Sequence, residues 1–162
     1  KPEFRVGDTI SEDASISFNA IPRFAPESFA FLNNPSPARY KPFRKGIEHL
    51  LAEDIVQVFH LIKPANPNNA LLGAVGPLQF EVLQFRLKEE YGAESQLEML
   101  SWQILRWVED SLDEVALADS LSYGVALARD DQGRRVILFH SEWIFKDFQE
   151  NHPEIALLNS PV

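Results

Sequence analysis

Residues 71–94 read LLGAVGPLQFEVLQFRLKEEYGAE, an apolar run with two glycines that passes through a proline into a helical pattern. The continuous apolar run at 70–76 is typical of a strand that is buried on both faces. Proline is well tolerated at the first position of a helix, and glycine is common just after its end. Pro77 and Gly92 therefore predict a helix over 77–91 that follows a buried strand directly.

The predicted helix has apolar residues on two sides rather than one. At 100° per residue, one stripe contains Leu78, Val82 and Phe85, and the roughly opposite stripe contains Phe80, Leu83, Leu87 and Tyr91. A surface helix needs only one apolar stripe to pack on its own sheet. We therefore expect a further element or domain to cover the second stripe.

The flanking segments have the patterns of further strands and helices. Residues 56–62 alternate and are rich in β-branched and aromatic side chains, which predicts a strand that turns back at 63–69. Other expected elements are an extended segment at 21–29, a helix around 43–51, and strands at 93–100 and 101–108. Residues 18–108 then give the order strand, helix, strand, strand, helix, strand, which is the split β-α-β of ferredoxin-like folds.

The rest of the chain repeats part of that order in a shorter form. It contains an expected helix at 111–120, strands at 123–130 and 134–141 joined across 131–133, and a helix at 141–153. We therefore expect an α+β fold with a ferredoxin-like part at 18–108 and a second, smaller β-α-β-β-α portion at 109–162. Residues 1–17 hold too few short β-type runs to make a sheet, so we expect an end piece there.

Composition limits the classes of function. The chain has 162 residues, no cysteine, and a formal net charge of -9. Disulfides and thiolate metal sites are excluded, no apolar stretch approaches the roughly 20 residues of a membrane span, and the cytoplasm is the expected compartment. The start KPEFRVGDT contains neither an initiating Met nor a secretory leader, which allows an internal fragment of a longer protein.

Nucleic-acid binding through the whole surface is disfavoured, because affinity for phosphates comes mostly from Lys and Arg. A local basic patch is still allowed, and positive charge gathers at Arg39, Lys41, Arg44 and Lys45. Such a cluster is more often a solvated face than a binding site.

The motifs of catalysis are missing from the sequence. Neither GxxxxGK[ST] nor GxGxxG is present, and we favour packing over phosphate binding for the Gly73–Gly76 pair. The four histidines lack metal-ligand spacing, and the pairs Glu89–Glu90 and Asp130–Asp131 are interpreted as solvated. Trp102, Trp107 and Trp143 are expected in the core rather than as stacking platforms. We thus predict no catalytic, cofactor-binding or metal-binding residue, and docking rather than catalysis.

Two segments together point to a known family. FRKGIEHLLAEDIVQVF at 43–59, followed by LLGAVGPLQFEVLQFRLKEEYGAE at 71–94, resembles the third domain of the bacterial class II release factors, the peptide chain release factor 3 family. Upstream, VGDTI at 6–10 and IPRFAPESF at 21–29 resemble the end of the β-barrel second domain and the entry to the third. The resemblance is weakest at 111–122.

The resemblance implies a role in translation termination. Members are three-domain translational GTPases that bind the ribosome and promote departure of class I release factors after peptide release. It implies that 1–17 ends the β-barrel domain, that 18–162 is the third domain, and that GTP or GDP binds the missing amino-terminal domain, so this chain is not itself an enzyme. Arg39, Lys41, Arg44 and Lys45 become candidate contacts to rRNA or proteins of the small ribosomal subunit. Leu78, Val82 and Phe85 become candidates for packing against the missing domains.

Two alternatives remain at this point. One is a fragment of an elongation factor G-like GTPase, which shares a ferredoxin-like third domain. The other is a stand-alone α+β protein-interaction module. The sequence preceding Lys1 would distinguish them, because a β-barrel and a P-loop there would identify a translational GTPase.

Overall fold

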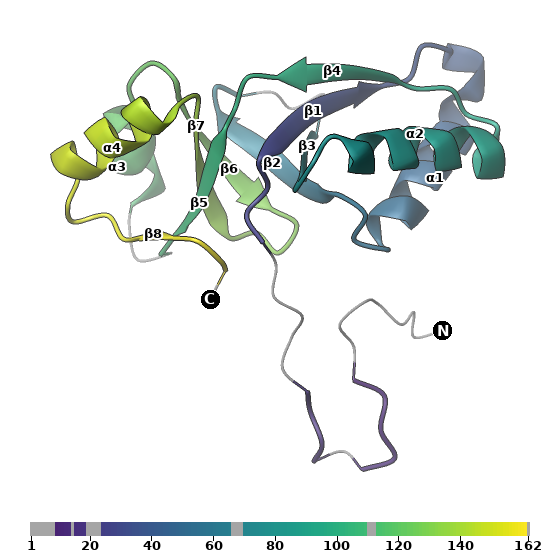
Figure 1. Ribbon diagram of the computed structural model, residues 1–162, viewed down its shortest axis with the longest axis horizontal. Coiled ribbons are helices and arrows are strands. Elements are labelled where there is room, and N and C mark those ends of the chain that lie inside the picture. The colour runs from purple at the N-terminus through teal and green to yellow at the C-terminus, as the bar shows by residue number, and fades with distance from the viewer. Residues whose placement is uncertain (1–8, 14, 19–23, 66–69, 110–112, 162) are drawn as a thin grey trace.

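The computed structural model describes residues 9–13, 15–18, 24–65, 70–109 and 113–161, and these form helices and antiparallel strands (Figure 1). The strands are β1 (Ser28–Asn33), β2 (Gln57–Lys63), β3 (Leu71–Ala74), β4 (Gln96–Leu100), β5 (Ile104–Val108), β6 (Val125–Asp130), β7 (Arg135–Phe139) and β8 (Leu157–Leu158). The helices are the 3-10 turn η1 (Pro37–Arg39), α1 (Tyr40–Leu51), α2 (Leu78–Tyr91), α3 (Glu114–Ser120) and α4 (Glu142–Asn151). The predicted α+β class is confirmed.

The strands form one sheet in the order β4-β1-β3-β2-β6-β7-β5-β8, with antiparallel neighbours. In β4-β1-β3-β2, strand β3 lies between the two strands that α1 connects, which is the predicted split β-α-β. Read from the other edge, β8-β5-β7-β6 has the same arrangement, with α3 and α4 as its helices. We call 28–100 the first unit and 104–158 the second unit; their likeness is a repeat of topology.

Two elements differ from the sequence predictions. The strand at Ile104–Val108, which we grouped with the ferredoxin-like part, pairs with β7 and β8 and so opens the second unit. Strand β4 already pairs with β1 at the outer edge of the first unit, so the first unit is complete without β5. Strand β1 begins at Ser28, later than the extended segment expected at 21–29, of which 21–23 lie outside the described residues.

The two units are joined by the pairing of β2 with β6, where Phe59 lies opposite Asp130 and Leu61 opposite Ala128. On the helical faces, one core lies beneath α1 and α2 and another beneath α3 and α4. A third core lies on the face without helices and draws on both units; it contains Phe29, Phe31, Phe59, Leu71, Leu105, Trp107, Ala126, Ala128, Val136 and Leu138. Both units therefore depend on a common hydrophobic core.

Helix α2 ends as its sequence predicts. Gly92 has φ 61°, in the left-handed region that favours glycine, and its N–H donates to the carbonyl of Lys88 at 3.0 Å. The helix packs across α1 at Gly46, which is buried. A Cβ placed on Gly46 would lie 2.8 Å from Leu87 Cδ2 and 2.8 Å from Tyr91 Cγ. The close approach of the two helices therefore requires a glycine at position 46.

The crossing of α1 and α2 gives a prediction about stability. Gly46→Val should lower the free energy of unfolding by about 1–3 kcal/mol, because the added methyl groups must displace buried Leu87 or the Tyr91 ring. Urea denaturation measures the loss. The matched control is Gly76→Ala, because nothing lies within 4 Å of a Cβ at that position. Equal stability of the Gly46→Val chain and the parent chain would contradict this account of the crossing.

Candidate functional site

Helix α1 presents a basic face to solvent. Arg39 ends η1, Lys41 lies in the first turn of α1, and all four predicted residues of the basic cluster are exposed. Lys41, Arg44 and Lys45 are spaced i, i+3 and i+4, so they share one side of the helix, opposite buried Gly46 and Leu50. The structure therefore brings three of the four cluster residues together on one side of α1, while Arg39 is exposed in the turn that precedes the helix.

The charge of this cluster opposes the helix that carries it. The amino-terminal end of a helix has partial positive charge, so cations there cost stability, and the first turn of α1 contains no acidic residue. Only Arg44 has a described acidic partner within the cluster, Glu48 at 2.9 Å, and both of those side chains are largely exposed. The Glu48 hydrogen bond raises the pKa of Arg44, so Arg44 stays charged. Lys41 and Lys45, which have no acidic partner among the described residues, are thus free to face an anionic partner.

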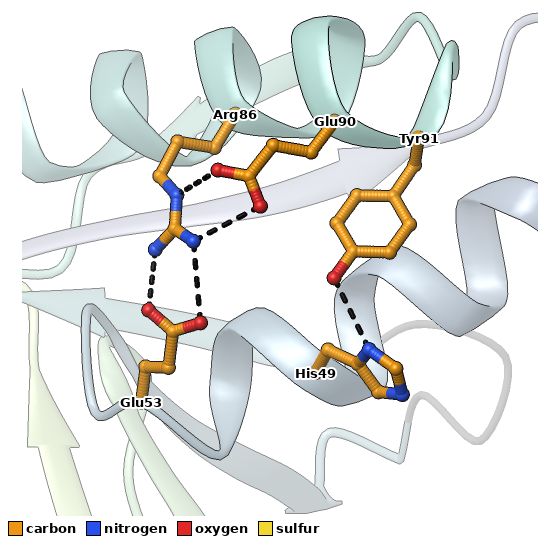
Figure 2. A network of polar contacts seen from close by, with 5 residues as sticks. All are labelled: His49, Glu53, Arg86, Glu90 and Tyr91. Atoms are coloured by element: carbon orange, nitrogen blue, oxygen red, sulfur yellow. Dashed lines mark hydrogen bonds and ion pairs between the residues drawn. The ribbon is translucent and has the colours of Figure 1, made fainter.

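Polar contacts attach α2 to the end of α1, as Figure 2 shows. The Arg86 guanidinium donates to Glu90 one turn further along α2 and to both carboxylate oxygens of Glu53, which follows α1. His49 Nδ1 lies 3.1 Å from the hydroxyl of Tyr91. Together with the close contact at Gly46, these pairs hold the two helices in one orientation.

Helix pairing through Arg86 makes stability depend on pH. The hydrogen bond from Arg86 lowers the pKa of Glu53 below its ordinary value. Because the pKa of Glu53 is lower in the folded chain than in the unfolded chain, its ionisation stabilises the fold. This stabilisation is complete above the unfolded-state pKa of about 4.3, and it is lost as pH falls through the folded-state pKa. The effect is small, because half of the Glu53 side chain is exposed.

Arg86→Gln should therefore raise the pKa of Glu53 towards its ordinary value, as followed by NMR titration of its carboxyl carbon. The stability difference between the parent chain and the variant should shrink as pH falls through the folded pKa of Glu53. Lys88→Gln removes the same charge from an exposed position two residues away and is the matched control. A Glu53 pKa that does not respond to Arg86→Gln would rule out this coupling.

The two apolar stripes of α2 have different surroundings. Phe80, Leu83 and Leu87 are fully buried in the core beneath the helices. In contrast, Leu78 is 66% exposed, Val82 42% and Phe85 66%. We call these three residues the exposed α2 stripe. Within the described chain nothing covers this stripe, as expected of an interdomain surface; its role as one stays a prediction.

The two glycines before α2 form no phosphate cradle. A Cβ on buried Gly73 would lie 2.8 Å from Phe59 Cε2 and from Pro26 Cγ, so this glycine permits close packing. The Gln79 side chain accepts from the backbone N–H of Val75 at 2.8 Å and Gly76 at 3.3 Å. The amides that would bind a phosphate at the start of α2 are thus already used by a side chain of the same helix.

A hollow of ≈ 350 Å³ lies where the turn between β4 and β5 meets the end of β7. In it Trp102 packs edge-on against His140, with 3.8 Å between ring centroids, and Ser101 Oγ lies 3.1 Å from His140 Nδ1. Burial lowers the pKa of His140, which favours its neutral form. A serine–histidine contact needs a third group to orient the imidazole as a general base, and no such bond to His140 is found among the described residues.

Asp130 was wrongly interpreted as a solvated turn residue. Its carboxylate is buried and accepts from Trp107 Nε1 at 3.1 Å, from Arg134 Nε at 2.8 Å, and from the backbone N–H groups of Gln132 and Arg134 at 3.0 and 2.9 Å. It thus shapes the β6–β7 turn and connects it to β5. The Asp-Asp-Gln-Gly pattern marks the turn, but the donor from Trp107 lies 23 residues away, so local sequence could not reveal it.

Two further searches concern sites of other kinds. Among the described residues, no three His, Asp or Glu side chains lie close enough together to hold a metal ion. None of the described helices combines the length and apolar character needed to span a bilayer.

Comparisons with known proteins show the family to which this chain belongs. The family model for the class II release factor RF3, C-terminal domain, matches residues 18–149. The chain therefore belongs to the class II release factor RF3 family and contains its C-terminal domain.

Several relatives are named peptide chain release factor 3. The protein of Synechococcus sp. is 41% identical over 154 residues, which is 95% of this chain and 27% of that protein. The protein of Trichodesmium erythraeum is 40% identical over 157 residues, covering 97% of this chain and 29% of the relative. The protein of Microcystis aeruginosa is 40% identical over 154 residues, which is 95% of this chain and 28% of that protein. This chain thus spans less than a third of the length of these relatives.

Proposed function

We propose that this chain is the ribosome-docking carboxy-terminal domain of a translational GTPase that promotes dissociation of class I release factors after peptide release in the cytoplasm. The family match over residues 18–149 carries the proposal, because that family is one of release factors and the similar relatives are named peptide chain release factor 3. We assign docking to this chain, and GTP binding and hydrolysis to the part of the longer factor that precedes it.

The basic face of α1 is the proposed contact with the small ribosomal subunit. Its exposed cations lie on one side of a helix, and an exposed local patch can bind phosphates although the whole chain carries a charge of -9. The rest of the factor would be the other possible partner of this face. The affinity for rRNA phosphates falls steeply as the salt concentration rises, and the affinity of most protein contacts depends less on salt. A salt series therefore distinguishes the two kinds of partner.

Lys41→Glu/Lys45→Glu in the full-length factor should weaken ribosome binding and flatten its dependence on salt. If each lysine neutralises one phosphate, the slope of log K against log salt should fall by about 1.4–1.8 in magnitude. Binding is measured by co-sedimentation with 70S ribosomes over a salt series. The control is Lys146→Glu on α4, in the second unit. It reverses the charge of one exposed lysine, as each substitution of the double variant does, and it should leave the slope of log K against log salt unchanged. Unchanged affinity and slope in the double variant would contradict the ribosomal contact.

The exposed α2 stripe is the proposed surface for packing against the GTPase and β-barrel domains. It is apolar and uncovered within the described residues, and over two thirds of each relative lies outside the aligned part. Burying such side chains against another domain contributes about 25 cal/mol for each Å² of apolar surface removed from water. Through this contact the state of the GTPase domain could reach α1 and the ribosome, because Arg86 and Gly46 couple α2 to α1.

The stripe gives a prediction that compares the isolated chain with the full-length factor. Leu78→Ser/Phe85→Ser should leave the melting temperature of the isolated chain nearly unchanged, because both side chains are already mostly exposed. In the full-length factor, the same change should lower the temperature at which this domain unfolds, as recorded by calorimetry. Glu89→Ser, at an exposed polar position of α2, is the control. Equal effects in both proteins would exclude packing of the stripe between domains.

A further inference from the structure

Two large aromatic side chains stand in solvent at one end of the second unit. Tyr123, in the loop before β6, is 97% exposed, and Trp143, in the first turn of α4, is 74% exposed. The prediction that Trp143 belongs to the core is wrong, although Trp107 is buried and Trp102 is half-buried. Neither Tyr123 nor Trp143 belongs to any of the three cores.

The backbone beneath these two residues is tightly built. Gly124 has φ 83°, and a Cβ there would lie 2.5 Å from Ile144 Cδ1, so only glycine allows the loop to approach α4 this closely. The carbonyl of Gly124 accepts from the N–H of His140 at 3.0 Å. Ser141 caps α4 by accepting from the N–H of Ile144. Since Tyr123 adjoins Gly124 and Trp143 adjoins Ile144, their Cα atoms lie within roughly 16 Å of each other.

Exposed Tyr and Trp on a fixed backbone are typical of binding surfaces. Such side chains bury a large area on binding and lose little conformational entropy, and they are enriched among the residues that contribute most to affinity in interfaces. Folding gains almost nothing from Tyr123, because it is nearly as exposed as in the unfolded chain. Most of the aromatic surface of Tyr123 and Trp143 is therefore left unburied by folding and is accessible to a binding partner.

The charged residues near Tyr123 and Trp143 indicate which class of partner can bind there. Helices α3 and α4 pack over the same core, and their exposed charged positions are mostly acidic: Asp113, Asp119, Glu142, Asp147 and Glu150, against Lys146. Lys146 is itself paired with Glu142 at 2.9 Å. An acidic surface repels phosphates and attracts cationic segments. It differs in sign from the basic face of α1 in the first unit.

We propose that Tyr123, Trp143 and the acidic face of α4 form a docking surface for a basic polypeptide segment that also carries apolar side chains. The apolar side chains pack on the two aromatic rings, while Lys or Arg side chains pair with the carboxylates of α4. This surface lies in the other unit from the basic face of α1 and the exposed α2 stripe. Its test does not require the ribosome, so it can fail or succeed independently of the proposed function.

The test uses fluorescence anisotropy of short labelled probes titrated with this chain. The probe is a lysine-rich peptide that contains two leucines; the comparison probes are the same peptide with glutamate in place of lysine and an oligouridylate of similar length. The lysine–leucine peptide should bind, with an affinity that falls as salt rises, and the two anionic probes should bind at least about tenfold more weakly.

Variants identify the surface. Tyr123→Ser/Trp143→Ser should weaken binding of the lysine–leucine peptide by about tenfold or more. Glu142→Gln/Asp147→Asn/Glu150→Gln should weaken it and flatten its salt dependence. Leu78→Ser/Phe85→Ser removes two exposed apolar side chains from the first unit without changing charge, and should leave binding as it is. Circular dichroism of each variant confirms that it is folded.

Three results would overturn the proposal. The first is no measurable binding of the lysine–leucine peptide to the parent chain. The second is a folded Tyr123→Ser/Trp143→Ser variant that binds it as tightly as the parent does. The third is binding of oligouridylate as tight as that of the peptide, which would indicate a nucleic-acid surface instead.

Discussion

The pairing of β2 with β6 is the interaction on which the rest of the molecule depends. It joins two four-stranded units into one sheet and places Phe59 of the first unit opposite Asp130 of the second. The buried carboxylate of Asp130 accepts from Trp107 Nε1, which lies on β5 and in the shared core with Phe59. Because a buried carboxylate is costly unless its hydrogen bonds are satisfied, this arrangement constrains strands of the second unit directly beside the joint.

The two units share a core on the face of the sheet that has no helices. On the other face, each unit has its own pair of helices and its own core. The first unit carries the basic face of α1 and the exposed α2 stripe, and the second carries acidic helices with two exposed aromatic residues. One continuous sheet thus carries surfaces of opposite charge on its two units. The residues proposed for docking on these surfaces are mostly exposed, so they lie outside the three cores that hold the sheet together.

Much of the fold could be predicted from local patterns. Helix α2 and its ends follow from Pro77, Gly92 and the periodicity between them, and the α+β class follows from the order of elements. The gathering of positive charge at 39–45 was also visible in the sequence. The shared side of Lys41, Arg44 and Lys45 was not, because the helix was expected from about 43 and α1 begins at Tyr40. The unit to which β5 belongs was not, since its sequence specifies a strand but not the neighbour with which it pairs. The role of Asp130 and the exposure of Trp143 depend on residues far away in the chain, so the same local reasoning led to wrong interpretations of both.

The sequence by itself determined where α2 begins and ends, which sides of α2 could be apolar, and where charge gathers, because these properties arise from neighbours within a few residues. Only the tertiary structure decided which apolar stripe of α2 is buried, since that depends on the contact of α1 with α2 at Gly46. It also decided that Gly73 serves packing against Phe59 and Pro26, and that Gln79 uses the amides before α2. The stretch LLGAVGPLQFEV therefore holds a strand and a helix in place, and the close contacts that show this come from residues brought together by folding.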